Sequence, residues 1–272
     1  MEEEKPAFIY GINPVQEALK ASRRRCFKIV IPKGKVNARV RSILTFSRSC
    51  GVKVEILPRE VFQKLYQPYV HQGIIGYFAP REPMDLEELV RQAFQGTRTP
   101  TLVVLDGIQD PGNLGAIIRS AEVLGIQGII LPRYRSASLN ETVAKCSSGA
   151  IETLSFTWAA NLARALDRLK KAGFWIVGVE PGGRTPCYGF EFNLPVALVV
   201  GGEEKGIRPL LRKKCDFSVS IPIQGALSSL NASAACAVVF YEILRQKKTG
   251  AGAGCGNGRE PVISEKKRPE IS

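Results

Sequence analysis

The chain has 272 residues, of which 44% are hydrophobic, and this is enough to bury the core of one large or two smaller domains. Lysine and arginine number 38 against 25 acidic residues, which gives a formal net charge of +13. No apolar run is long enough to cross a bilayer, so we expect a soluble protein without a membrane partner.

The first 80 residues have the pattern of a small α/β domain. Asn13-Pro14 precedes the periodic segment VQEALKAS and predicts a capped helix with Pro14 at its first position. Three strands follow, with a helix expected at 37–50 between the first two. The strands are FKIVIP (27–32), VKVEIL (52–57) and GIIGYF (73–78).

A long basic stretch lies inside this domain. From Ala18 to Val54 there are eleven lysines and arginines and no acidic residue. A stretch of this kind favours a polyanionic partner, RNA or DNA, over a membrane surface. The alternative is a solvated basic face without a ligand. The candidate nucleic-acid contacts are Arg23, Arg24, Arg25, Lys33 and Lys35.

Residues 81–100 hold an acidic helical segment between prolines, which predicts a linker or a domain boundary. From residue 101 to 247 strands and helices alternate, so we expect a parallel sheet covered on both faces, with ligands beyond the carboxyl ends of its strands. The tail, 248–272, is rich in glycine and then charged, and we expect it to be disordered. The elements expected between 101 and 247 are strands TLVVL, GIILP, FWIVGV and VALVV, helices at 113–124 and 139–147, and a long helix in SSLNASAACAVVFYEILRQ.

Several chemistries are excluded by what the chain lacks. His71 is the single histidine and the seven cysteines form no Cys-x-x-Cys pair, so we expect no metal site. Neither a P-loop nor a G-x-G-x-x-G fingerprint is present, and a Ser-His-Asp triad would have to use His71. The unclustered cysteines and the acidic start, MEEEKPAF, predict a cytoplasmic protein with reduced thiols.

Three loops at strand ends remain as candidates for ligand binding. They span 106–115, 199–206 and 221–231, and Lys205 is their one basic residue. Loops with carboxylates and few cations suit a ligand with hydroxyls, an adenine and a positive centre, and S-adenosylmethionine has all three. The alternative is that the glycines only form tight turns.

These loops also resemble the three signature motifs of the SpoU (TrmH-type) family in the SPOUT superfamily. The motifs are the segment from Asn113 to Arg119 with Glu122, then LVVGGEEKGI, then IPIQGALSSLNASAA. The segments FIYGINPVQEALKA and HQGIIGYF resemble the RNA-binding domain appended to some members, which is similar to a small ribosomal protein.

The resemblance implies a fold and an activity. The fold would be an N-terminal RNA-binding domain (1–80), a linker (81–100) and a C-terminal SPOUT domain (101–247) with a deep trefoil knot. The activity would be transfer of a methyl group from S-adenosylmethionine to the ribose 2′-oxygen of a guanosine in large-subunit (23S) ribosomal RNA, by a homodimer whose subunits share each active site. The alternatives are the same reaction on transfer RNA, or a non-catalytic RNA-binding or assembly factor.

The resemblance also assigns catalytic positions. Arg119 matches the catalytic arginine, with Asn113 beside it, and Glu203 and Asn231 match the acid and the amide of the second and third motifs. A guanidinium normally stays protonated, so Arg119 either takes the proton of the 2′-hydroxyl or orients that hydroxyl as a fixed donor. Simpler interpretations are an ion pair of Arg119 with Glu122, helix caps at Asn113 and Asn231, and a solvated Glu203.

The cofactor positions come from the same resemblance. Gly201, Ile221 and Leu230 match backbone positions that hold the adenine and ribose. The chain departs from the family at Gly202, where serine or alanine is expected, and at Glu204, where relatives often have glycine. We expect the missing side chain at Gly202 to be tolerated.

Overall fold

The computed structural model describes residues 6–134, 136–203 and 205–249, so the predicted disorder of the tail falls almost wholly outside the described residues. The chain divides into two compact units. Unit 1 comprises Met1–Glu82 and Ser138–Thr153, and unit 2 comprises Pro83–Ala137 and Leu154–Ser272. No described helix has the length and apolar character needed to cross a membrane.

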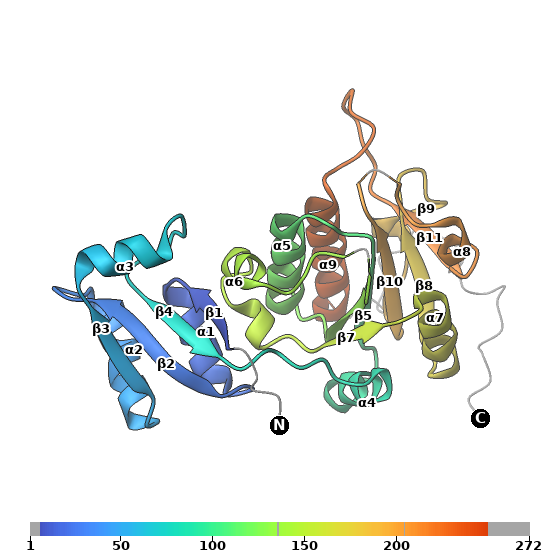
Figure 1. The fold of residues 1–272 in the computed structure, drawn as a ribbon. Helices are drawn as coiled ribbons and strands as arrows, with labels where there is room; N and C mark the ends of the chain where they lie inside the picture. The colour runs from blue at the N-terminus through green and yellow to red at the C-terminus, as the bar shows by residue number, and fades with distance from the viewer. Residues whose placement is uncertain (1–5, 135, 204, 250–272) are drawn as a thin grey trace. The chain divides into compact units, whose positions relative to one another are not determined.

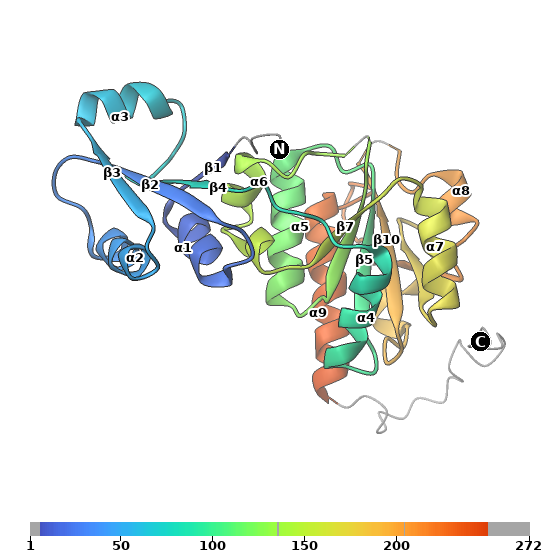
Figure 2. The ribbon, with the colours of Figure 1, turned by 60° about the horizontal axis from the view of Figure 1, so that its bottom comes forward.

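Unit 1 is built on a four-stranded sheet in the order β1-β4-β2-β3. The β2–β3 pair is parallel and the other two pairs are antiparallel. Helices α1 and α2 cover one face and α3 covers the other (Figure 2). The elements are β1 (Ala7–Tyr10), α1 (Ile12–Ala21), β2 (Cys26–Pro32), α2 (Ala38–Ser49), β3 (Lys53–Leu57), α3 (Arg59–Tyr66) and β4 (Ile75–Phe78).

The three strands and the second helix predicted for this unit are confirmed, but the start of α1 is not. The helix begins at Ile12, so Pro14 is its third residue and Asn13 lies inside it. Proline is tolerated there because the first four N–H groups of a helix have no intrahelical partner. Asn37 caps α2, and its side chain accepts a hydrogen bond from the Val40 amide at 2.8 Å.

A segment that follows β6 in the sequence belongs structurally to unit 1, although it was predicted as part of the 101–247 domain. Its helix α6 (Glu141–Cys146) packs against β1, and its 3-10 turn η1 (Ala150–Glu152) packs against α1. Arg24 Nη2 lies 2.6 Å from Glu152 Oε1, and the two side chains are 6% and 1% exposed. Burial raises the pKa of Glu152, and the charge of Arg24 opposes that rise. The ion pair fixes the segment, because an unpaired charge in this place would be strongly destabilising.

Unit 2 contains a seven-stranded sheet in the order β7-β6-β5-β10-β8-β11-β9 (Figure 1). Every strand pair is parallel, as the alternating sequence pattern predicts. The strands are β5 (Thr101–Asp106), β6 (Gly128–Pro132), β7 (Phe156–Ala159), β8 (Trp175–Val179), β9 (Thr185–Pro186), β10 (Val196–Gly201) and β11 (Phe217–Ser220). A second 3-10 turn, η2 (Cys187–Gly189), precedes β10.

Helices cover both faces of this sheet. On one face lie α4 (Leu86–Gly96), α7 (Leu162–Lys171) and α8 (Pro209–Arg212), and on the other lie α5 (Pro111–Val123) and α9 (Ala232–Thr249) (Figures 1 and 2). The prediction of a linker at 81–100 is therefore wrong for most of its length, whereas the alternative of a domain boundary agrees with the division of the chain between Glu82 and Pro83. Leu89 of α4 is fully buried in one core cluster with Val104 and Leu166, so the helix is part of unit 2.

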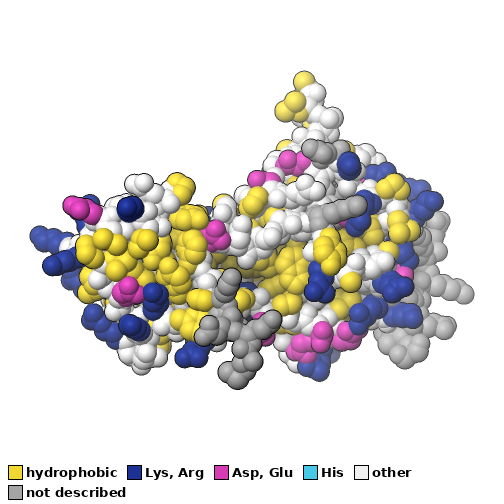
Figure 3. All heavy atoms as spheres, viewed as in Figure 1, with side chains coloured by type: hydrophobic (Ala, Val, Ile, Leu, Met, Phe, Trp, Pro, Cys, Tyr) yellow, Lys and Arg dark blue, Asp and Glu magenta, His cyan; other side chains and the backbone are white. Residues whose placement is uncertain are grey.

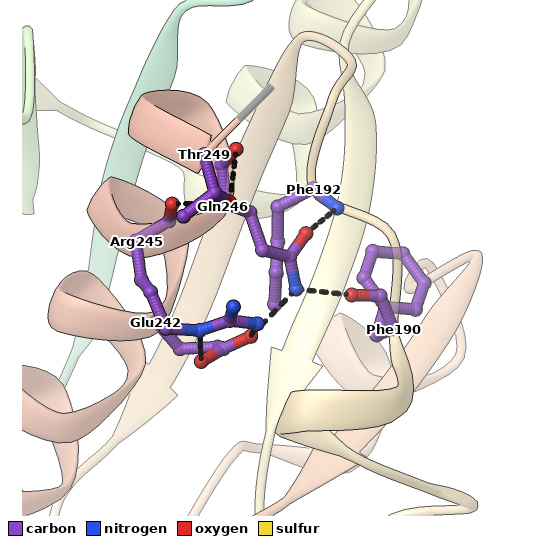
Figure 4. Close-up of polar contacts among 6 residues, drawn as sticks. All are labelled: Phe190, Phe192, Glu242, Arg245, Gln246 and Thr249. Carbon is purple, nitrogen blue, oxygen red and sulfur yellow. Dashed lines mark hydrogen bonds and ion pairs between the residues drawn. The ribbon is translucent and has the colours of Figure 1, made fainter. Parts of the chain in front are cut away.

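Helices α5 and α9 pack side by side, which the small residues Ala232 and Cys236 of α9 allow. The far end of α9 is held by Gln246, whose side chain is buried and bridges to the loop before β10 (Figure 4). Its Oε1 accepts a hydrogen bond from the Phe192 amide at 2.8 Å, and its Nε2 donates to the Phe190 carbonyl at 2.9 Å. This pairing satisfies backbone groups that no strand or helix partner reaches. The strand order does not test the predicted knot, which stays a prediction.

Replacing Gln246 by leucine keeps the volume but leaves the Phe192 amide and the Phe190 carbonyl without these partners. We expect Gln246→Leu to lower the free energy of unfolding by about 2 to 4 kcal/mol, measured by urea denaturation. The control is Gln95→Leu at an exposed position of α4, which should change stability by less than about 0.5 kcal/mol. Equal effects of the two substitutions would contradict the anchoring role of Gln246.

Candidate functional site

Two adjoining pockets lie at the carboxyl ends of the central strands of unit 2. The β8–β10 pocket has a volume of about 650 Å³ and is bounded by the ends of β8 and β10, the loop 202–206, the loop 221–231 and the start of α9. The β5–β10 pocket has a volume of about 340 Å³ and is bounded by the loop after β5, the end of β6 and the loop 202–208. Gly202, Glu203 and Gly206 line both pockets.

Three of the four predicted catalytic residues meet between these pockets. The Nδ2 atom of Asn113 donates to Glu203 Oε1 at 2.9 Å, and that of Asn231 donates to the same oxygen at 2.6 Å. Asn231 Nδ2 also lies 2.9 Å from Asn113 Oδ1. The three residues come from α5, from the loop after β10 and from the residue before α9, and they form one network.

The sequence left open that Asn113 and Asn231 only cap helices, and the structure shows this cap for Asn231 alone. Asp110 caps α5 through a hydrogen bond from the Asn113 amide at 2.7 Å, so the cap is Asp110 and the Asn113 side chain is available to Glu203. Asn231 does cap α9, since its Oδ1 accepts from the Ser233 amide at 2.9 Å. Its amide nitrogen is used in the network at the same time.

The loop that presents Glu203 depends on glycines that permit close backbone contact. A Cβ atom on Gly201 would lie 2.0 Å from the carbonyl carbon of Gly206, and one on Gly202 would lie 2.5 Å from the Gly107 carbonyl oxygen. Gly206 has a positive φ of 58°, which other residues rarely adopt. A side chain at 202 would therefore force the backbone at Gly107 to move, whereas the sequence only led us to expect that the glycine is tolerated.

A buried carboxylate anchors the same loop, and the sequence did not identify it as a site residue. Asp106 is the last residue of β5 and is 3% exposed. It accepts hydrogen bonds from the backbone amide of Arg208 at 2.9 Å and from its Nε at 2.7 Å. The sequence could have indicated Asp106, because an acid at the carboxyl end of a buried strand needs a partner for its charge.

Arg119, the fourth predicted catalytic residue, is not part of this network. It lies six positions after Asn113 on α5, so helix geometry puts it about 9 Å further along the axis and about 120° around it. Its side chain is exposed, and within the described residues it makes no hydrogen bond or ion pair. The expected ion pair with Glu122 is accordingly not formed. Glu204, the neighbour of Glu203, lies outside the described residues.

The predicted cofactor residues Gly201, Ile221 and Leu230 all line the β8–β10 pocket. Val179, Pro181 and Ile223 add apolar wall, and Glu180 and Glu203 add carboxylates. Among the described residues that line this pocket there is no lysine or arginine. Apolar walls, hydroxyl-accepting carboxylates and a lack of cations suit an adenine, a ribose and a sulfonium, so the residues present fit S-adenosylmethionine.

The predicted RNA contacts of unit 1 divide into two groups. Arg23, Arg25, Lys33 and Lys35 are exposed, whereas Arg24 is committed to Glu152 and to the Ala79 carbonyl at 3.1 Å. We therefore assign Arg24 a structural role. Hydrophobic side chains gather on the face of unit 1 seen in Figure 3, over β2, β4 and α3. Within this unit the half-buried Phe8, Tyr69 and Tyr77 pack against a core cluster that contains Tyr10, Phe62 and Tyr66.

His71 is packed within unit 1. Its Nδ1 accepts a hydrogen bond from the Gly73 amide at 3.0 Å, and its ring lies edge-on to Phe62 with centroids 4.8 Å apart. Burial and the nearby Lys145 lower the pKa of His71. No group of three His, Cys, Asp or Glu in the described ranges is arranged to hold a metal ion.

Comparison with known families decides the assignment. The family model described as SpoU rRNA Methylase matches residues 100–241, and a model described as RNA 2′-O ribose methyltransferase substrate binding matches residues 8–84. The chain belongs to the SpoU family. It is an RNA methyltransferase of that family.

Relatives span nearly the whole chain. The Bacillus subtilis protein YacO, named for the TrmH family of tRNA/rRNA methyltransferases, is 35% identical over 88% of this chain and 96% of its own. A protein of Staphylococcus saprophyticus with the same family name is 36% identical over 88% and 95%. The solved SpoU methyltransferase AviRb from Streptomyces viridochromogenes, in complex with AdoMet, is 24% identical with a TM-score of 0.77, covering 90% of this chain and 92% of that chain. This likeness confirms the α/β fold that the sequence predicts.

A methyl group at position 202 should damage the site, because its Cβ would collide with the Gly107 carbonyl. We expect Gly202→Ala to weaken S-adenosylmethionine binding by about 5- to 100-fold, which is the cost of overpacking a rigid contact. Isothermal titration calorimetry measures this effect. Gly225→Ala, in the loop 221–231, has open space around the new methyl group and should bind within about twofold of the wild type. If Gly202→Ala bound S-adenosylmethionine as tightly as the wild type, the loop would have moved to accommodate the new methyl group, and the prediction would be wrong.

Proposed function

We propose that this SpoU family member methylates the ribose 2′-oxygen of a guanosine in large-subunit (23S) ribosomal RNA, in the cytoplasm and as a homodimer. The network of Asn113, Glu203 and Asn231 between the two pockets is the observation that supports catalysis most directly. The description of the second family model, RNA 2′-O ribose methyltransferase substrate binding, supports the 2′-oxygen as acceptor. The deep knot stays part of the proposal, on the basis of the family resemblance alone.

The β8–β10 pocket would hold S-adenosylmethionine, with its adenine against Ile221 and Leu230 and its ribose near Glu203. Bound there, the cofactor supplies an electrophilic methyl group on a positive sulfur. The β5–β10 pocket, which shares Glu203 with it, would take the acceptor ribose. Asn113 and Asn231 hold one oxygen of Glu203, which leaves the other oxygen to accept a hydrogen bond from a hydroxyl. The residues thus orient both reactants before the methyl group moves.

Arg119 would act in the site of the partner subunit. Within one chain it lies on a different side of α5 from Asn113, and its side chain is exposed. Large hydrophobic residues are exposed on the two neighbouring helices, where Val123 of α5 is 68% and Tyr241 of α9 is 60% exposed, and such a surface is typical of a subunit interface. There Arg119 would orient the 2′-hydroxyl and stabilise the charge that develops on its oxygen as the proton leaves.

The activity is tested by incubating the protein with S-adenosylmethionine and unmodified 23S ribosomal RNA, with transfer RNA in parallel. Mass spectrometry of nuclease digests should show 2′-O-methylguanosine from the ribosomal RNA, and Arg119→Ala should lower its formation at least about 100-fold, as loss of one charge-stabilising donor does. Product from transfer RNA alone would overturn the proposed substrate. Cofactor binding without product from either RNA would leave the alternative of a non-catalytic assembly factor.

Mixing two inactive variants tests the shared site. If each site takes Arg119 from one subunit and Asn231 from the other, a mixed dimer of Arg119→Ala and Asn231→Ala keeps one intact site. Equal mixing with subunit exchange should restore about a quarter of the wild-type activity, because half of the dimers are mixed. No recovery in a sample that contains mixed dimers would place both residues in the same subunit's site.

A further inference from the structure

A third pocket also lies at the carboxyl ends of the unit 2 strands, and the proposed reaction does not use it. This β6–β7 pocket has a volume of about 730 Å³, within the range of small-molecule binding sites. It is bounded by the segment 83–87, by the ends of β6 and β7, and by the first two turns of α7.

The β6–β7 pocket is adjacent to the proposed acceptor site. Pro132, the last residue of β6, lines the β5–β10 pocket, and the next residue, Arg133, lines the β6–β7 pocket. Consecutive Cα atoms lie about 3.8 Å apart, so the two pockets have lining residues next to each other at the end of this strand. Both pockets lie at the carboxyl ends of the strands, so we consider the β6–β7 pocket for a neighbouring unit of a chain molecule whose reacting unit lies in the β5–β10 pocket.

The charges around this pocket favour an anion. Arg133, Arg164 and Arg168 line it, against Asp85 and Glu87. Arg168 is paired with Glu87. The side chains of Arg133 and Arg164 are exposed and, among the described residues, make no hydrogen bond or ion pair. Two guanidinium groups without internal partners suit a phosphodiester, which arginine binds with paired hydrogen bonds.

The pocket also contains an aromatic surface. Trp158, in the edge strand β7, is half-buried, and its ring contacts Phe156 edge-on with centroids 6.1 Å apart. A half-buried tryptophan, next to arginines whose side chains have no hydrogen bond or ion pair with another described residue, is the combination with which proteins hold an unpaired base and its phosphate.

We propose that the β6–β7 pocket binds a nucleotide flanking the methylated one, with its base stacked on Trp158 and its phosphodiester held by Arg133 and Arg164. This rests on the proposed function, since it takes the substrate to be RNA. It adds that the RNA must be single-stranded at this nucleotide, because a paired base cannot leave its stack to reach the indole. The pocket thus selects an unpaired acceptor segment.

Kinetics of variants at the pocket's arginines and at Trp158 test the proposal. The double variant Arg133→Ala/Arg164→Ala and the single variant Trp158→Ala should each raise KM for the RNA by about 5- to 100-fold, the range expected for loss of one stacked base. KM for S-adenosylmethionine should stay within twofold, and Trp158→Phe should recover most of the RNA affinity. The control is Arg98→Ala, an exposed arginine just before β5, at the amino-terminal end of the strands, which should leave both KM values unchanged.

Tryptophan fluorescence gives a readout that does not require turnover. The chain has two tryptophans, and the second, Trp175, is buried. An unpaired oligoribonucleotide should quench the wild-type emission, a fully paired duplex of the same sequence should not, and Trp158→Phe should lose the quenching. Because Trp158→Phe keeps an aromatic ring at the edge strand, it also guards against loss of folding.

The outcomes separate this proposal from the proposed function. Quenching by unpaired RNA without any methylation would overturn the proposed function and keep the nucleotide pocket. Normal methylation with an unchanged KM for RNA in Trp158→Ala and in the double arginine variant would overturn the pocket and keep the function. Equal quenching by unpaired RNA and by duplex would also overturn the pocket as a site for a single-stranded base.

Discussion

The site depends on the contact between the ends of two neighbouring parallel strands, β5 and β10. Their register sets Gly201 opposite Asp106, and the Gly202 amide donates to the Asp106 carbonyl at 2.9 Å. The Asp106 carboxylate then holds both the amide and the guanidinium of Arg208, so the loop between them is fixed at its two ends. Glu203 is presented from this loop to the amides of Asn113 and Asn231. A loop held in this way keeps its donors and acceptors in place without rearrangement, which is the condition for effective catalysis.

The charge of the side chains that line the three pockets changes from one pocket to the next along the carboxyl ends of the strands. The β8–β10 pocket has carboxylates and, among its described lining residues, no cations, which suits a positively charged cofactor. The β5–β10 pocket has Lys205 and Arg208 beside acids, and the β6–β7 pocket has three arginines. The sheet edge therefore changes from a surface that favours a cation to one that favours a phosphate backbone. An enzyme that brings a sulfonium to a polyanion needs both surfaces within a short distance of each other.

Unit 1 contains the basic stretch, but its arginines do not all serve the same purpose. Arg24 is buried against Glu152, a residue that follows β6 in the sequence, and the pair ties the segment 138–153 to the N-terminal sheet. Its neighbours Arg23 and Arg25 are exposed. Three consecutive arginines in the sequence thus include one that stabilises the fold and two that stay candidates for RNA contact.

The sequence by itself determined the fold class, most strands and the family. Runs such as TLVVL and VALVV are almost wholly apolar, and their alternation with helical segments predicts parallel strands covered on both faces. The motif residues Asn113, Glu203 and Asn231 were identified by resemblance, and their hydrogen bonds agree with a common site. Only the tertiary structure decided that α4 belongs to the core of unit 2 and that Glu152 pairs with Arg24 across 128 residues. It also decided that Asp106 anchors the loop of Glu203 and that Arg119 lies apart from the hydrogen-bond network. These features depend on contacts between segments distant in the chain, and local periodicity contains no information about which segments meet.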